Sequence, residues 1–261
     1  SRSSMNFRTI YILVILSFIT SCSFSGGEND AKRLIANGMT PKELYQKAED
    51  LLSAGSIDQA IDQYEEILAS YPGSKYAVQA RLDISYNLYK RKKYTRAINE
   101  LNTFIQRYPS NIHTPYAYYL RGIVAEEKSS SILDEIITDV AQRDVQGIRE
   151  AYSYYVALIE KFPDSKYSKD AFEKLNKLKN ILAKHEFYIA IYYTNKGSNI
   201  AAINRAQFII QNFPNSSLMP DSLHLMAHNY DILNAIELAN DARKILTSNY
   251  PSYSPNYSLK N

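Results

Sequence analysis

An aromatic residue followed directly by proline occurs at five places in this chain, and this repeated pair constrains the fold more than any other feature. A residue that precedes proline is disfavoured in helical conformation, so each pair predicts the end of one helix and the turn before the next. The successive prolines are 37, 54, 51 and 37 residues apart, and two of these spacings approach the roughly 34-residue period of a tetratricopeptide repeat. The pairs end in Pro72, Pro109, Pro163, Pro214 and Pro251.

An alanine stands twelve residues before each of these prolines, where the two helices of a hairpin would have to approach closely. These small residues are Ala60, Ala97, Ala151, Ala202 and Ala239. Four residues further on, the first three units carry a large side chain, whereas the last two carry Ala206 and Arg243. Apolar residues also recur three and four apart, as in amphipathic helices. The sequence therefore predicts an all-α fold, a tetratricopeptide-repeat solenoid of about five helix hairpins.

Two of the repeats are expected to depart from the standard length. In the third unit, we expect helices over 114–127 and from about Gly147 to Lys161, with a loop and a short helix projecting between them. In the fourth unit, no helix breaker occurs between residue 168 and Gly197, which predicts one long helix that braces two parts of the solenoid. The predicted segments are a signal peptide at 1–21, a lipidated linker at 22–40, N-terminal repeats with the start of the third unit at 41–127, an insertion at 128–147, C-terminal repeats at 148–251 and a tail at 252–261.

The beginning of the sequence has the layout of a secretory signal that ends in a cysteine. Arg8 precedes an apolar run that extends from Ile10 to Ile19, about half the length that a membrane-spanning helix needs. The large Ile19, three residues before Cys22, does not suit an ordinary signal peptidase and resembles a bacterial lipobox instead. We therefore expect Cys22 to be lipidated and to hold the protein on a membrane surface; the alternative is a buried structural cysteine. Ser23 follows it rather than the aspartate that retains lipoproteins in the inner membrane, which indicates the outer membrane.

Charge and residue content argue against several classes of function. The chain has 30 basic and 27 acidic residues, and without the two arginines of the signal segment the balance falls to 28 against 27, which gives no support to nucleic-acid binding. It has a single cysteine and no glycine-rich phosphate loop, so we expect no enzyme and no cofactor. His224 and His228 have the i, i+4 spacing of metal ligands, but Leu225 stands where a zinc protease has its glutamate. A metal-dependent hydrolase would need a third ligand, and no metal site is predicted.

Tyrosine is unusually frequent, with 23 copies, and some of these residues are not explained by packing of the repeats. A tyrosine ring offers a rigid apolar face and a hydroxyl at a small cost in side-chain entropy, which suits binding of an extended peptide. The alternative is that these rings pack beneath neighbouring helices. The predicted substrate-peptide groove consists of Tyr45, Glu49, Leu82, Tyr86, Tyr89, Tyr116, Tyr119 and Ile123.

Two longer stretches, "YAYYLRGI" at 116–123 and "LAKHEFYIAIYYTNKGSNIAAINR" at 182–205, carry a resemblance to a known family. Together with the lipobox and the repeats, they resemble the BamD family, the tetratricopeptide lipoproteins of the bacterial outer-membrane β-barrel assembly machinery. The resemblance implies a non-catalytic protein, lipid-anchored at the periplasmic face of the outer membrane. It also implies that the N-terminal repeats bind the targeting segments of unfolded outer-membrane proteins.

The same resemblance assigns the C-terminal repeats to docking on a POTRA domain of BamA. The family arginine that forms an ion pair with BamA corresponds to Arg205, next to Asn204. Other Bam lipoproteins are further implied partners. A lipoprotein pilotin or pilus-assembly factor would have the same lipobox and repeats, and it remains the alternative.

Overall fold

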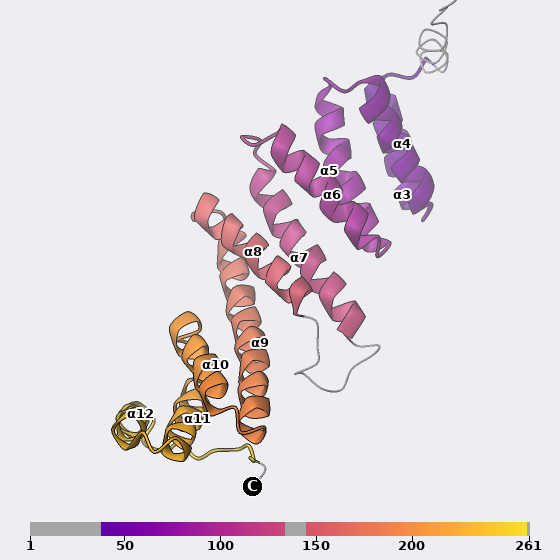
Figure 1. Cartoon of the computed structure of the whole chain (residues 1–261). Coiled ribbons are helices and arrows are strands. Elements are labelled where there is room, and N and C mark those ends of the chain that lie inside the picture. Colours follow the sequence, from indigo (N-terminus) through magenta and orange to yellow (C-terminus); the bar gives the residue numbers. More distant parts are fainter. Residues whose placement is uncertain (1–37, 134–144, 260–261) are drawn as a thin grey trace, which may run out of the picture. The chain divides into compact units, whose positions relative to one another are not determined.

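The computed structural model describes residues 38–133 and 145–259, and this part of the chain forms ten α-helices (Figure 1). The helices pair into five consecutive hairpins, so the predicted all-α tetratricopeptide-repeat fold is confirmed. No helix in the described residues is both long and apolar enough to span a bilayer. The helices are α3 (Pro41–Ser53), α4 (Ile57–Ser70), α5 (Lys75–Lys90), α6 (Tyr94–Arg107), α7 (Thr114–Leu133), α8 (Gln146–Lys161), α9 (Ser168–Asn195), α10 (Asn199–Asn212), α11 (Met219–Ile232) and α12 (Ile236–Asn249).

The chain divides into two compact units, one up to Ala80 and one from Arg81 onward. In the first unit α3 packs against α4, and α3 begins with a capping box in which Thr40 and Glu43 satisfy each other's backbone amides. In the second unit each hairpin from α7 onward packs on the helix before it, with contacts from α6 to α7, from α8 to α9 and from α10 to α11. Because one hairpin cannot bury all its apolar faces alone, this stacking supplies the core.

The aromatic–proline pairs end the second helix of every hairpin, as the sequence predicts. Each aromatic residue is the C-cap, and its amide donates to the carbonyl four residues earlier before the proline opens the turn. The predicted alanines are all completely buried, as expected where two helices approach closely. The C-capping residues are Tyr71, Tyr108, Phe162, Phe213 and Tyr250.

A second recurring turn joins the two helices within four of the hairpins, and sequence analysis did not identify it. In each, one residue has positive φ: Gly55, Lys92, Gly197 and Asn234. The amide of the next residue donates to the carbonyl five positions earlier at 2.8–2.9 Å, which is the Schellman arrangement. Glycine adopts this left-handed conformation without strain, whereas Lys92 holds it against a steric cost.

Tyr155 fills the large-side-chain position of the third hairpin and is completely buried. Its ring lies against Gly122 of α7 so closely that a Cβ atom there would come within 2.4 Å of the ring. Its hydroxyl donates to Glu126 at 2.7 Å. Gly122 therefore makes room for the ring, and the glycine and the tyrosine act as a matched pair.

The third and fourth hairpins differ in how well their helix ends were predicted. The helix α7 continues to Leu133, six residues past the expected end at 127, so the first part of the predicted insertion is helical. Ser129 is buried there, and its side chain lies against Gly147 near the start of α8, which extends the packing between the two helices. The predicted long helix is confirmed as α9, which contacts α8 as well as α10 and α11 (Figure 1).

Candidate partner-binding surfaces

Tyr45 and Glu49 belong to the first compact unit and pack within it. The Tyr45 ring lies 5.4 Å from Tyr64 and 5.6 Å from Tyr76, and the Tyr64 hydroxyl donates to Glu49. Both predicted groove residues are half-buried. Their contacts tie them to the second helix of their own hairpin and to the start of α5.

The other six predicted groove residues lie in the second unit on α5 and α7, and they differ in exposure. Tyr86 is 42% exposed, and its ring lies 6.1 Å from Tyr89. The Tyr89 hydroxyl donates to Glu127 of α7 at 2.5 Å. Leu82 is buried at 5% exposure, and Ile123 is half-buried. Tyr86 is therefore the predicted side chain most available to a peptide.

Tyr116 and Tyr119 on α7 gather around Tyr167, the residue before α9. The rings of Tyr119 and Tyr167 stack at 5.2 Å, and Tyr116 lies 5.5 Å from the same ring. The Tyr119 hydroxyl donates to Asp170 of α9. Sequence reasoning missed Tyr167 and Asp170 because it counted positions on the first helices of only the first three hairpins.

Burial and neighbouring carboxylates control the ionisation of these hydroxyls. Burial, followed by the hydrogen bond to Glu127, raises the pKa of Tyr89, and burial, followed by the hydrogen bond to Asp170, raises the pKa of Tyr119. Burial also raises the pKa of Tyr116, and the nearby Tyr86 hydroxyl adds to that effect. Tyrosine hydroxyls are already protonated at physiological pH, and these higher pKa values keep the three hydroxyls neutral hydrogen-bond donors at more alkaline pH as well.

Arg205 lies on α10, and its guanidinium contacts a buried carboxylate on α9. Its Nη1 atom donates to Glu186 Oε2 at 2.8 Å, and Arg149 of α8 donates to the other oxygen at 3.2 Å. The Glu186 side chain is 4% exposed, whereas the two arginines are 43% and 42% exposed. One buried negative charge thus orients two half-exposed positive charges, which leaves a net positive charge facing solvent.

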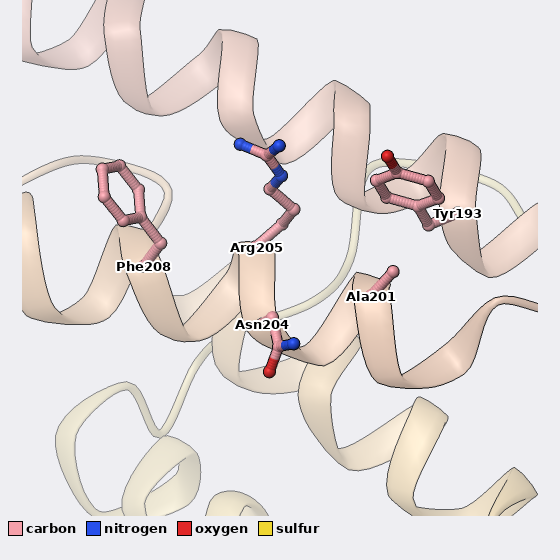
Figure 2. Close-up of a pocket in the computed structure, with 5 residues that line it drawn as sticks. All are labelled: Tyr193, Ala201, Asn204, Arg205 and Phe208. Atoms are coloured by element: carbon pink, nitrogen blue, oxygen red, sulfur yellow. The ribbon is translucent and has the colours of Figure 1, made fainter.

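A shallow hollow of about 380 Å³ surrounds the exposed part of Arg205 (Figure 2). In this view Tyr193 of α9 and Phe208 of α10 lie on either side of the guanidinium, and Ala201 lies below Tyr193. Asn204 also lines the hollow and is exposed, but its amide points away from the guanidinium. An arginine in a hollow that is also lined by two aromatic side chains suits a partner carboxylate flanked by apolar groups.

The two histidines of the alternative hydrolase reading lie on α11. His224 Nδ1 is hydrogen-bonded to the Tyr257 hydroxyl at 2.7 Å, and burial, followed by the charge of His228, lowers its pKa. In residues 38–133 and 145–259 no three metal-ligating side chains come together. The predicted lipidation site, Cys22, lies outside the described residues.

Comparison with known proteins agrees with the family resemblance. Residues 37–246 match the family model YfiO, described as "Outer membrane lipoprotein". The chain is 33% identical to outer membrane protein assembly factor BamD of Neisseria meningitidis serogroup A over 94% of this chain and 92% of that protein. It is 29% identical to the protein of the same name from Xylella fastidiosa strain 9a5c, over 92% of this chain and 83% of that protein.

Among solved structures, a thermophilic tetratricopeptide-repeat protein of Thermus thermophilus is similar at 13% identity, with a TM-score of 0.39 over 82% of this chain and 93% of that one. The match over residues 37–246 covers the ten helices almost completely. The chain belongs to the YfiO family of outer membrane lipoproteins.

Proposed function

We propose that this protein is a non-catalytic, lipid-anchored component of the β-barrel assembly complex at the periplasmic face of the outer membrane. In this role an aromatic face of the repeats binds targeting segments of unfolded outer-membrane proteins. This aromatic face consists of Tyr86 and Tyr89 of α5, Tyr116 and Tyr119 of α7, and Tyr167 before α9. Its C-terminal repeats dock on a POTRA domain of BamA through Arg205, with Asn204 beside it. The assembly-factor names of its relatives support this role for the chain.

The observation that carries the docking part of the proposal is the arrangement around Arg205. A surface arginine ordinarily loses side-chain entropy when it binds a partner, which reduces the affinity. Here Glu186 already holds the guanidinium in place, and the second carboxylate oxygen is occupied by Arg149. The site therefore presents an oriented cation to an incoming carboxylate, with Tyr193 and Phe208 available for apolar contacts.

The test is the exchange Arg205→Glu, followed by co-purification of BamA from membranes. We expect BamA recovery to fall at least tenfold, because the variant places a negative charge where a partner carboxylate would bind and beside the buried Glu186. Circular dichroism should show unchanged helix content.

Arg243→Glu is the matched control, since Arg243 has similar exposure, 44%, and pairs with Asp231 on another surface. It should leave BamA recovery unchanged. Undiminished recovery with Arg205→Glu, or an equal loss with both variants, would contradict the assignment.

A further inference from the structure

Residues 250–259 turn back toward α11 and α9 after α12 ends at Asn249. In Figure 1 this yellow segment runs from α12 past α11 toward the lower end of α9. It has no regular secondary structure beyond the turn at 251–252. Tyr253, Tyr257 and Leu259 are half-buried, whereas the residues between them are exposed. The tail therefore lies on the surface as an irregular, non-helical segment, and within residues 251–259 only the side chains of Tyr253, Tyr257 and Leu259 are partly buried.

The inward side chains meet the first helices of the last two hairpins. The Tyr253 hydroxyl donates to Asp221 of α11 at 2.6 Å, and the Tyr257 hydroxyl is hydrogen-bonded to His224 of α11 at 2.7 Å. The Tyr257 ring also meets the Phe187 ring of α9 edge to face at 5.1 Å. Burial raises the pKa of both tyrosines, which keeps their hydroxyls protonated.

These contacts have the character of peptide recognition rather than of core packing. Two tyrosines four residues apart provide three ring contacts, one with Phe187 and two with His224, and two hydroxyl hydrogen bonds, while the residues between them are exposed. The receiving residues come from two adjacent helices, α9 and α11, which contact each other directly. Repeat proteins bind extended segments on surfaces of this kind.

We propose that the surface formed by Phe187, Asp221 and His224 is a second peptide-binding site, which the chain fills with its own tail. Its partner in trans is an extended peptide segment that carries two aromatic side chains four residues apart. The tail is then an intramolecular competitor that such a segment must displace. This inference does not rest on the proposed function, because neither BamA nor a barrel protein takes part in it.

The tether explains why a small set of contacts suffices to occupy the site. A short linker gives a tethered segment an effective concentration in the millimolar range, so weak contacts are populated without high affinity. Pro251 and Pro255 stiffen the tail and reduce the entropy lost on docking. A competing segment on a partner gains access only when its own affinity, or its own tethering, exceeds that of the tail.

The experiment uses a fluorescein-labelled synthetic peptide that copies residues 250–261 and measures its binding by fluorescence anisotropy. The receiving proteins are the full chain, the full-length variant Tyr253→Ser/Tyr257→Ser with a released tail, and a chain that ends at Asn249. We expect the peptide to bind the released-tail variant and the shortened chain at least tenfold more tightly than the unaltered chain. Adding Phe187→Ala to the released-tail variant should abolish this gain.

Phe172→Ala is the control for loss of a phenylalanine elsewhere on the same helix; Phe172 is 53% exposed, whereas Phe187 is 4% exposed with the tail in place, so the thermal unfolding of the Phe187→Ala variant is measured alongside its peptide binding. It should leave peptide binding to the released-tail variant unchanged. A copy of the peptide with both tyrosines replaced by serine should not bind. Equal binding by the unaltered and released-tail proteins, absent binding by both, or equal effects of the two phenylalanine variants would overturn the proposal. The proposed BamA docking would remain untouched by any of these results.

Discussion

Glu186 shows how a single buried charge organises a surface. It lies on α9, accepts hydrogen bonds from Arg149 and Arg205, and is almost inaccessible to solvent. A buried carboxylate is costly unless its oxygens are satisfied, and here each oxygen has an arginine partner. The two arginines remain half-exposed. The ion pairs that satisfy Glu186 therefore also fix the orientation of the two guanidinium groups that a partner would meet.

Glu186→Gln should lower both stability and partner binding. The exchange keeps the side-chain shape but removes the charge and turns an amide NH₂ toward arginine donors. We expect the free energy of unfolding to fall by about 1–3 kcal/mol, as for a buried hydrogen-bonding partner that is lost. Urea denaturation measures this loss, and BamA co-purification should weaken in parallel because Arg205 is no longer oriented.

Asp231→Asn provides the comparison, since it breaks the exposed pair with Arg243. Exposed ion pairs contribute little, so no measurable loss of stability is expected. Unchanged stability in Glu186→Gln would mean that the buried carboxylate is not satisfied mainly by the two arginines.

At the scale of helices, steric fit decides how two neighbours meet. The close approach of α7 and α8 depends on Gly122, whose missing Cβ leaves space for the completely buried Tyr155 ring. The residue of the second hairpin that corresponds to Tyr155 is Leu101, which is also completely buried. In the third hairpin the helix-to-helix distance thus depends on a pair of residues rather than on one.

Gly122→Ala should destabilise the protein even though alanine favours helices. The added Cβ would lie 2.4 Å from the ring, and overpacking of this kind costs about 1–3 kcal/mol, more than the ~1 kcal/mol gained from helix propensity. Thermal unfolding monitored by circular dichroism measures the difference. Tyr155→Leu alone should also destabilise, but the double variant should be more stable than the sum of the two losses predicts. Simple additivity would show that the two side chains do not compete for the same space.

At the scale of the whole molecule, the two surfaces of the proposed function, one for unfolded outer-membrane proteins and one for BamA, use different residues and share no partners. The aromatic face involves α5, α7 and the start of α9, whereas the Arg205 hollow involves the second half of α9 and α10. Sites without shared partners generally respond to substitution independently. Substrate binding and docking should therefore be separable by mutation.

Tyr86→Ala combined with Tyr119→Ala should reduce crosslinking to peptides from the C-terminal ends of barrel proteins by several-fold, with BamA recovery unchanged. The reason is the loss of one exposed ring and of one ring stacked on Tyr167. Arg205→Glu should reduce BamA recovery and leave crosslinking to the barrel peptides unchanged. The triple variant should lose both BamA recovery and crosslinking. The phenylalanine versions, Tyr86→Phe and Tyr119→Phe, retain the rings and should retain most crosslinking. Undiminished crosslinking in the alanine variant would assign these rings to packing alone.

The sequence by itself determined the hairpin organisation, because its signals are local. A proline after Tyr108 or Phe162 disfavours helical conformation at the residue before it, and an alanine such as Ala97 recurs twelve residues before each of these prolines. The long helix α9 followed in the same way from the absence of a breaker before Gly197. The end of α7 was missed because a run of serines reads as a loop, whereas Ser129 is buried against Gly147.

Only the tertiary structure decided which side chains act together. Glu186 meets Arg149 and Arg205 across 37 and 19 residues, and the Tyr257 ring reaches back to Phe187 of α9. Helical periodicity assigns each residue to a face of its own helix, but the partner on that face depends on how the helices stack and where the tail returns. The placement of charges and rings is therefore a property of packing, and local sequence signals carry no information about it.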